Sequence, residues 1–478
     1  MTQARTSTSR QCPIPTSQPT GVPKFELTSI RWVDAILRWR PLQFTLIAVT
    51  LGFFVLAILT SLAGTPVGNR NFGIIFVWIV WWALVIIILV PLAGRLWCAM
   101  CPIPAPGEWL QRQAFIAPRS RLLRTLSKRW PNRLKNIWIQ NFAFLGVAVF
   151  SAIILTRPSV TGLLLLAFVL LAIGLSLMYE RRIFCRYVCP VGGFIGLYSM
   201  IAPIELRVKD PEVCRDHKTK ECYLGSENGF GCPWLVFPGS LKRNAYCGLC
   251  TECLKTCSMN NIALNLRPPG LDLLVSRERR LDEAYKAVIM STCALLYSAI
   301  LLGPWGALKD AANMKDWRTW AIYAIGFVAM NLAVVPGLFY AAAWLSRRWA
   351  RLSQVPTRRL FVDFAYALVP LGLMAWIAFS LSFVLVNISY ALPVLSDPFG
   401  WGWDLLGTRD FPWTPYFPDR IPYLQVPILI IGLVFGLYIA WRIVDEHASA
   451  PEQALRGVVP IATFLLVATF GFLGLYLG

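Results

Sequence analysis

Four cysteines near the middle of the chain have a spacing that can hold an iron–sulfur cluster. Cys247, Cys250, Cys253 and Cys257 follow the pattern C-x2-C-x2-C-x3-C. In this pattern a short loop supplies three thiolates to one [4Fe–4S] cube, and the fourth thiolate reaches a second cube. A structural zinc site, the alternative for such a cysteine set, usually uses two C-x2-C pairs separated by a longer loop. The spacing therefore favours iron–sulfur ligation over zinc.

Three more cysteines precede this loop at wider and irregular intervals. Cys214, Cys222 and Cys232 are separated by seven and nine residues, and Pro233 follows the last of them. They form an irregular counterpart of the first half of a two-cluster ferredoxin, in which the cysteine before the proline belongs to the other cube. The sequence therefore predicts two cubes in this region, with one cysteine ligand missing.

Two ligand sets remain open for these seven cysteines. In the first set, one cube is held by Cys232, Cys247, Cys250 and Cys253, and the other by Cys214, Cys222 and Cys257 with a fourth ligand. In the second set, one cube is held by Cys214, Cys222, Cys232 and Cys257, and the missing ligand belongs to the other cube. Cys12, which precedes a proline near the N-terminus, is a candidate for the missing ligand, as is a non-cysteine group.

A second cysteine motif occurs twice, with the copies 87 residues apart. Cys98 and Cys101 form C-x2-C-P, and Cys185 and Cys189 form C-x3-C-P, each after a pair of apolar stretches. Repetition of a whole unit argues against chance, so we expect the four thiols to meet at the membrane surface. Nearby arginines such as Arg182 would favour thiolate over thiol. The four thiols could hold a third cluster, form a redox-active dithiol, bind copper(I) or zinc, or merely mark tight helix ends.

The composition places these motifs in a membrane protein. The mean hydropathy is +0.57, 56% of the residues are hydrophobic and 15% are charged, which excludes an ordinary soluble protein. A helix needs about 20 apolar residues to cross a bilayer. The stretches that meet this length are 43–64, 73–94, 137–156, 161–179, 285–303, 319–345, 361–390, 424–441 and 457–477. We therefore predict an α-helical integral membrane protein with about nine transmembrane helices and a small cytoplasmic ferredoxin-like α+β insert.

These stretches divide the chain into four parts. We expect a cytoplasmic tail over 1–42, a four-span region with the repeated Cys-Pro motifs over 43–204, the insert over 205–284 and a five-span membrane domain over 285–478. Within them, the basic and apolar segment 108–135 is expected to form an amphipathic helix on the inner leaflet. The Trp-rich loop 391–423 is expected to lie on the outer interface, as an aromatic belt or as a docking place for an external partner.

The distribution of basic residues predicts the orientation. With the N-terminus inside, the inner segments hold 38 of the 45 lysines and arginines, as the positive-inside rule requires. Twelve of the thirteen cysteines then lie on the inner side, where a reducing compartment keeps thiolates free to bind iron. We therefore expect a multi-pass protein of the cell inner (cytoplasmic) membrane, with the N-terminus and the insert in the cytoplasm. The net charge of +20 reflects this topology and does not indicate nucleic acid as a partner.

The C-terminal spans carry no recognisable motif. The chain has two histidines, His217 and His447, both in predicted inner segments, so a b-type haem held by two histidines across the bilayer is excluded. No C-x2-C-H motif for c-type haem occurs either, and quinone is the membrane carrier we expect instead. Polar residues inside spans are functional candidates by default; here they are Asn331, Asp363, Asn387 and, at a helix end, Glu180.

Taken together, these features resemble a known family, the NapH/NosR-type membrane-bound polyferredoxins, which are 4Fe-4S ferredoxin-type proteins and include CcoG-like members. The resemblance covers about residues 40–265 and rests on Cys98, Cys101, Cys185, Cys189 and the loop 247–257. It implies electron transfer between the quinone pool or a cytoplasmic donor and a partner redox protein. The chain departs from the family pattern in its shorter first Cys-Pro motif and in the cysteine that is missing before the loop.

The sequence thus predicts a membrane-bound iron–sulfur electron-transfer protein with two [4Fe–4S] clusters, and a third if the Cys-Pro thiols hold one. No residue set indicates bond-making catalysis, so we expect a component of an oxidoreductase system rather than a stand-alone enzyme. The expected partners are periplasmic or membrane-bound redox proteins, quinone and the lipid bilayer. The alternative is a metallo-assembly factor that reduces or delivers metal, for example copper for an oxidase. A third hypothesis is a transporter whose clusters act as a sensor.

Overall fold

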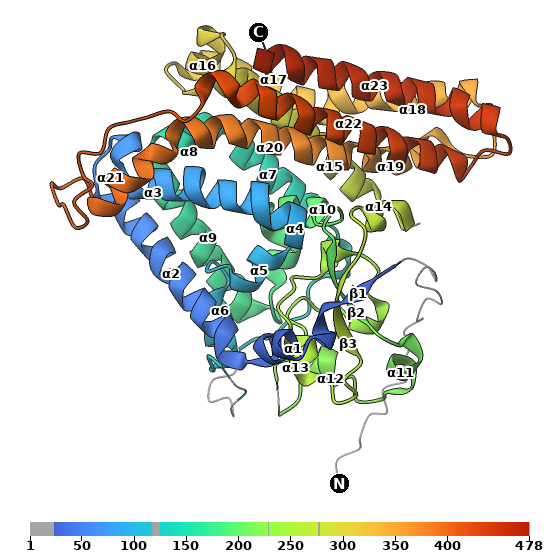
Figure 1. Cartoon of the computed structure of the whole chain (residues 1–478), viewed down its shortest axis with the longest axis horizontal. Helices are drawn as coiled ribbons and strands as arrows, with labels where there is room; N and C mark the ends of the chain where they lie inside the picture. The colour runs from blue at the N-terminus through green and yellow to red at the C-terminus, as the bar shows by residue number, and fades with distance from the viewer. Residues whose placement is uncertain (1–22, 117, 119–124, 228, 276–277, 478) are drawn as a thin grey trace.

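The computed structural model describes residues 23–116, 118, 125–227, 229–275 and 278–477. Cys12, the candidate for the missing ligand, lies outside the described residues. Most of the described chain is helical, and a small sheet lies on one side of the helical bundle (Figure 1). The cysteine motifs lie where the bundle and the sheet meet.

Eight helical segments of the described chain are long and apolar enough to cross a membrane. They are α2 (Arg40–Ala63), Phe72–Ala93, α9 (Pro158–Met178), Leu281–Leu302, Trp317–Trp349, Thr357–Ser396, Pro418–Asp445 and α23 (Pro451–Leu477). Each exceeds or approaches the roughly 20 residues that a bilayer core requires. This is the architecture of a multi-pass membrane protein, as the composition predicts.

Several of these segments consist of more than one element. They contain α3 (Phe72–Ile74), α4 (Val90–Ala93), α15 (Leu281–Tyr297), α17 (Trp317–Ala329), α18 (Val335–Trp349), α19 (Thr357–Phe364), α20 (Leu368–Asn387), α21 (Ala391–Ser396) and α22 (Ile421–Asp445). The joins are π-helical turns at Ile75–Trp81, Leu84–Leu89, Ser298–Leu302 and Met330–Val334, and 3-10 turns at Ala365–Ala367, Ile388–Tyr390 and Pro418–Arg420. Turns of the π type often occur at functional sites, and the first two line a cavity described below.

The predicted span 137–156 is not among these eight segments and consists of two short helices. α7 (Trp138–Val149) and α8 (Ser151–Thr156) meet at Phe150, whose φ of −92° and ψ of 8° interrupt the helix. Neither helix alone has the length of a span. The end of α8 nevertheless lies beside the turn after α2, since a Cβ on Gly68 would stand 2.9 Å from the carbonyl oxygen of Thr156.

The chain runs back and forth between two ends of the bundle. At the far end, the amide of Thr65 donates to the carbonyl of Phe399 over 2.8 Å, and Arg157 donates to the carbonyl of Asn313 over 3.2 Å. The opposite end, which we call the insert end, carries both Cys-Pro motifs and the sheet (Figure 1). α20 lies in the middle of the bundle, where it packs against α15 and α22.

The insert is built around an antiparallel sheet of strand order β1-β3-β2. The strands are β1 (Phe25–Glu26), β2 (Ile204–Val208) and β3 (Ile262–Leu266), and Glu26 and Glu205 both stand opposite Asn265. The helices and 3-10 turns around it are Leu27–Ser29, α1 (Arg31–Arg38), α11 (Pro211–Asp216), α12 (Glu221–Leu224), Pro238–Ser240, Asn244–Tyr246, α13 (Glu252–Thr256) and α14 (Leu271–Val275). Because β1 and α1 come from the predicted tail, the described part of that tail packs into the insert.

Short elements connect the spans to the insert. They are α5 (Leu96–Met100), α6 (Ala105–Arg112), Asn132–Leu134, the π turn Phe184–Val188 and α10 (Pro190–Tyr198); Gly68–Arg70 and α16 (Gly306–Ala312) lie at the far end. The expectation of one amphipathic helix over 108–135 is wrong for the described residues. α6 ends at Arg112, and Lys128 forms a bridge with Tyr179. The backbone at Leu126 and Lys128 bonds to Leu177 and Met178 at the end of α9, and to Glu180 just after it, instead of within a helix.

Candidate iron–sulfur sites

The two Cys-Pro motifs come together at the insert end. α5 carries Cys98 and ends at Cys101, and the π turn carries Cys185 and ends at Cys189. Three of these side chains are less than a tenth exposed. Burial, followed by the neighbouring Cys189 and Cys98 thiols, raises the pKa of Cys101. We call these four cysteines the membrane group.

The unequal spacing of the two motifs has a structural reason. An α-helical turn over Leu96–Met100 serves the C-x2-C motif, whereas a π turn over Phe184–Val188 serves the C-x3-C motif. A π turn is one residue wider than an α turn. The extra residue of the second motif is therefore taken up within the helix turn.

Backbone geometry at the second motif favours a negatively charged sulfur. Cys189 is the N-cap of α10, Pro190 is its first residue, and the amide of Gly192 donates to Cys189 Sγ over 3.2 Å. Burial raises the pKa of Cys189 to about 11, although this N–H group opposes the rise. Free amides at a helix N-terminus stabilise an anion, so this arrangement favours negative charge on the Cys189 sulfur.

Cys232 joins the three leading cysteines of the loop, and we call this set the central group. Its members, Cys232, Cys247, Cys250 and Cys253, line one small cavity together with Trp234. Burial raises the pKa of Cys247 to about 11 and that of Cys250 to about 12, and the Cys232 thiol adds to both increases. Four thiols thus share one enclosed, poorly solvated space.

The loop of the central group has an unusual backbone. Leu249 and Thr251 have φ angles of 51° and 58°, in the left-handed region. This conformation is that of a backbone nest, and the N–H groups of Leu249 and Glu252 act to lower the pKa of Cys247 and Cys250 against the effect of burial. Backbone nests of this kind bind anions, including iron–sulfur centres.

Gly248 is needed here because Trp234 lies against the loop. A Cβ at position 248 would stand 2.0 Å from Trp234 Nε1. Trp234 is 2% exposed and stacks on the Arg95 guanidinium, whose central carbon lies 4.2 Å from the ring centroid. The tryptophan therefore closes the central group on the side that faces the membrane group.

The remaining cysteines, Cys214, Cys222 and Cys257, form the distal group. Burial, followed by the Cys257 and Cys214 thiols, raises the pKa of Cys222 to about 12. Asn261 connects the group, since its Nδ2 donates to Cys214 Sγ over 3.2 Å and its backbone amide donates to Cys257 Sγ over 3.4 Å. This arrangement, with Cys232 in the central group, is that of the first of the two predicted ligand sets.

Arginines connect the membrane group to the insert. Arg182 donates through Nη1 to the carbonyl of Cys98 over 2.9 Å and through its backbone amide to the carbonyl of Pro233 over 3.1 Å. Its Nε donates to the buried Glu108 carboxylate over 2.8 Å. The charge of Arg182 interacts with the Cys185 and Cys250 thiols. The charge of Arg95 acts to lower the pKa of Cys189 and Cys247. Two fixed positive charges thus stand between the membrane and central groups.

Cysteine sulfur alone makes up the donor set of the three groups. Within the described ranges, no three His, Cys, Asp or Glu side chains stand close enough to hold one metal ion. A cube binds each thiolate to a different iron, so its four sulfurs must stand further apart than four ligands of one ion. Thiolate sulfur surrounded by N–H donors is the environment of iron–sulfur clusters.

The polar residues predicted inside the spans have protein partners. Asn331 donates to the carbonyl of Phe327 over 2.9 Å and accepts from Cys293 Sγ over 3.2 Å, and Asn387 donates to the carbonyl of Phe383. Asp363 lies at the insert end in an ion network with Arg279, Arg359 and His447. Glu180 follows the end of α9, and its backbone amide bonds to Lys128. These contacts are structural, and the cysteine groups remain the chemical centre.

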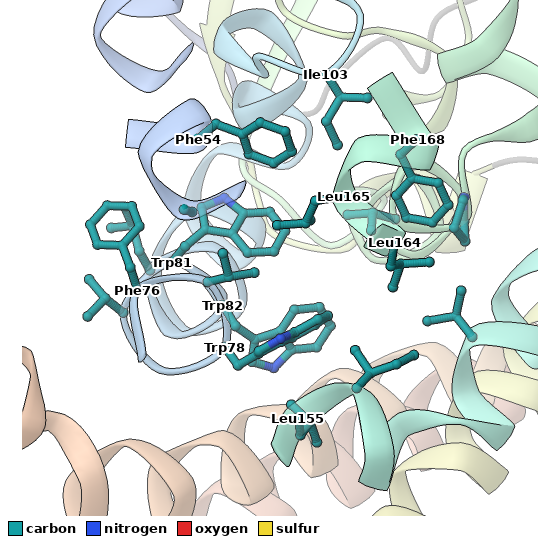
Figure 2. A pocket seen from close by; sticks show the side chains of 18 of the residues that line it. Phe54, Phe76, Trp78, Trp81, Trp82, Ile103, Leu155, Leu164, Leu165 and Phe168 are labelled. Carbon is teal, nitrogen blue, oxygen red and sulfur yellow. The ribbon is translucent and has the colours of Figure 1, made fainter. Parts of the chain in front are cut away.

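An apolar cavity of about 240 Å³ lies inside the bundle, next to the membrane group. It is enclosed by α2, the π turns of the second span, α7, α8, α9 and α20, and it reaches Cys101, Pro102, Pro190 and Val191. Figure 2 shows the rings of Phe54, Trp81, Trp78 and Phe168 around the open space. Trp81 Nε1 is buried and has no hydrogen-bond partner among the described residues, whereas Trp78 Nε1 donates to Thr161 over 3.1 Å.

Sequence reasoning missed several residues of these sites. Asn261, Trp234 and Glu108 carry no motif, and only folding brings them to the cysteines. The Trp-rich composition of residues 76–82 is a signal that could have indicated the aromatic cavity, but it resembles any aromatic span.

The comparisons with known proteins agree with this chemistry. The model of a 4Fe-4S binding domain family matches residues 74–131 and 161–209, which contain both Cys-Pro motifs. Two relatives are the uncharacterized proteins MJ0750 and MJ0749 of Methanocaldococcus jannaschii. The first is 24% identical over 196 residues, 38% of this chain and 76% of that protein, and the second is 24% identical over 184 residues, 38% and 69%. No solved structure matches the chain. The family match supports an iron–sulfur protein of the ferredoxin type with a role in electron transfer.

Proposed function

We propose that this protein is a membrane-bound electron carrier of the NapH/NosR type that holds three [4Fe–4S] clusters. Their ligands would come from the membrane group, the central group and the distal group. One observation carries the proposal: eleven cysteines that are far apart in the sequence gather into three neighbouring sets of thiols with N–H donors at the sulfurs. The family match over both Cys-Pro motifs supports cluster ligation by the membrane group.

A bound cluster supplies a one-electron carrier whose potential depends on ligation, hydrogen bonds to sulfur and burial. The side chains around the three groups set those conditions. Arg95 and Arg182 provide positive charge between the membrane and central groups, which favours the reduced state on both sides. Asn261 donates two hydrogen bonds to the distal group. Trp234 and the buried loop keep water away from the central group.

The distal group has three cysteines and needs a fourth ligand. Cys12 is one candidate. His217 is another, because its Nε2 lies 3.5 Å from Ser258 Oγ, next to Cys257. A histidine ligand in place of cysteine raises the potential of a cluster, so the two candidates predict different potentials for this site.

We propose quinone as the membrane partner, and the apolar cavity as its binding site. The cavity is lined almost entirely by apolar side chains of the spans and reaches Cys101 and the residues that follow Cys101 and Cys189. Trp81 lines the cavity, and its buried Nε1 has no hydrogen-bond partner within the described part of the chain, so we propose that it donates to a carbonyl of the bound quinone. A hydrophobic ring and tail bound there would lie next to the membrane group, where electron exchange is shortest.

The orientation follows from charge. Basic residues concentrate at the insert end, so we propose that this end faces the cytoplasm of a cell whose inner membrane holds the protein. The far end would then present the loop between α21 and α22 to the periplasm. There the exposed rings of Trp401 and Trp403 and the half-buried ring of Phe399 pack on one another, and we propose that a periplasmic or membrane-bound redox partner docks on them.

The quinone proposal can be tested with two tryptophans of the same cavity. Anaerobic protein in nanodiscs would be mixed with menadiol or duroquinol. The decrease in the protein's visible absorption, which reports electron transfer to its clusters, would then be followed. Trp81→Phe removes the free donor, and loss of one hydrogen bond of about 1–1.5 kcal/mol should raise the half-saturating quinol concentration about fivefold to tenfold. Trp78→Phe is the matched control, because its donor is already engaged by Thr161, and it should change this value less than about twofold.

Two results would count against the assignment. If wild-type protein with full iron content exchanges no electrons with any quinol or quinone, quinone is not the partner. If both tryptophan variants lose affinity equally, the free donor of Trp81 is not the recognition element.

A further inference from the structure

A second cavity, of about 150 Å³, lies at the insert end and has a different character. Four basic side chains line it, Arg95, Lys135, Arg186 and Arg280, and one acidic side chain, Glu283. We call it the basic pocket. It lies beside the membrane and central groups and contains none of their cysteines.

The one carboxylate of the basic pocket is already engaged. Glu283 accepts from Arg243 over 2.7 Å, and from the hydroxyls of Tyr246 and Tyr366. Its negative charge is therefore balanced from behind the pocket and does not neutralise the lining. Of the four cations, Arg280 is paired with Asp282 over 2.6 Å. The pocket thus keeps a net positive charge.

Arg95 is buried and incompletely bonded. It is 6% exposed, and its Nη1 donates to the carbonyl of Ala245. Nε and Nη2 have no hydrogen-bond partner in the described part of the chain. The guanidinium lies against α10 where a Cβ on Gly192 would stand 3.4 Å from Nη2 and one on Gly196 2.8 Å from Nη1. Glycine at positions 192 and 196 makes room for the Arg95 guanidinium. Its Nε and Nη2 donors then remain at the basic pocket.

Unsatisfied donors on a buried cation cost free energy unless something accepts from them. A group with several acceptor oxygens and negative charge is the best match for guanidinium and ammonium donors. A cavity of this volume holds several waters, and so has room for one phosphate group.

We infer that the basic pocket binds a phosphate group. Its position allows two sources of that group. The lining residues Lys135 to Ile137 and Arg280 directly precede α7 and α15, so the pocket lies at the boundary between the spans and the insert. There it can take the headgroup of an anionic phospholipid or a free phosphate. The site goes beyond the proposed electron transfer and does not depend on it.

The test uses two cations at the mouth of the pocket, which are not part of the cysteine sites. Lys135→Gln/Arg280→Gln removes both. The matched control is Arg348→Gln/Arg442→Gln, which removes two exposed arginines at the same end of α18 and α22. Iron content and thermal unfolding of both variants establish that they fold like the wild type.

Two arms distinguish the sources. In detergent, titration calorimetry measures binding of inorganic phosphate to phosphate-free protein. In nanodiscs of phosphatidylcholine with a minority of phosphatidylglycerol, native mass spectrometry measures which lipid stays with the purified protein. A site for free phosphate is identified if phosphate binding is saturable and its affinity falls at least about tenfold in the pocket variant but not in the control variant. A lipid site is identified if the wild type and the control variant selectively retain phosphatidylglycerol and the pocket variant does not.

The inference is overturned if the pocket variant and the control behave alike in both arms. Phosphate or phosphatidylglycerol binding that both variants lose to the same extent would also overturn it, because it would reflect general surface charge.

Discussion

Gly248→Ala should disable the central group, and the structure gives the reason and the size of the effect. The added Cβ would lie 2.0 Å from Trp234 Nε1, whereas real Cβ contacts stay beyond 3.0 Å. The loop and the tryptophan must therefore separate by about 1 Å. Trp234 is fully buried and stacked on Arg95, so it has little freedom to move.

Overpacking of this kind costs about 1–3 kcal/mol. The closed loop would then be about 5-fold to 150-fold less populated relative to open forms that do not present Cys247 and Cys250 together. We expect purified Gly248→Ala to lose about four of its irons and the electron paramagnetic resonance signal of one cluster. The signals of the other two groups should remain.

A double variant makes the test specific. Trp234→Phe removes the indole nitrogen that the new methyl group would strike, so Gly248→Ala/Trp234→Phe should recover iron relative to Gly248→Ala alone. Gly326→Ala is the control, because a Cβ at that position meets no atom within 4 Å. Full iron content and unchanged spectra in Gly248→Ala would refute the reasoning, as would a double variant with no more iron than the single one.

Three further predictions concern the neighbouring sites. Asn261→Leu removes one hydrogen bond to Cys214 Sγ. In a redox titration the reduction potential of the distal cluster should fall, while the potentials of the other two clusters stay unchanged. Equal shifts of all three potentials would contradict this prediction. In metal-free protein, burial raises the pKa of Cys189 to about 11, so only about one thiol in a thousand is ionised at pH 8. Iodoacetamide labelling should therefore accelerate about tenfold per pH unit from pH 7 to 10, whereas a rate that levels off between pH 9 and 10 would show an ordinary thiol. Glu108→Gln leaves the buried Arg182 without its carboxylate, so the free energy of unfolding should fall by about 3–5 kcal/mol in thermal or chemical unfolding. Glu212→Gln breaks an exposed ion pair and should lower it by less than about 1 kcal/mol.

The sequence is informative where chemistry depends on local spacing. The loop from Cys247 to Cys257 folds within a few residues, so its spacing alone predicts iron–sulfur ligation. Hydropathy likewise predicts the spans, because length and apolar composition are properties of single segments. The break at Phe150 could not be predicted in this way, since the residues around it, 142–155, are apolar except for Ser151.

Other features depend on contacts between distant segments. The sequence left two ligand sets open, and only the folded chain shows that Cys232 lines one cavity with Cys247, Cys250 and Cys253, which favours the first set. The sequence does not link Asn261 to Cys214 or Glu108 to Arg182, because these partners are 47 and 74 residues away. The difference between the two Cys-Pro motifs, one residue in the sequence, became interpretable only as a π turn.

The central claim is that three cysteine groups each hold a [4Fe–4S] cluster, and the most direct test is an iron count. Iron and acid-labile sulfide would be measured per chain in anaerobically purified wild type, in Cys98→Ser/Cys185→Ser, and in Cys293→Ser as a control outside the groups. We predict about twelve irons in the wild type and in the control and about eight in the double variant, with one paramagnetic resonance signal lost. About eight irons in all three proteins would contradict a cluster at the membrane group and favour a dithiol or metal-delivery role for its cysteines. Zinc in place of iron would contradict the electron-transfer account as a whole.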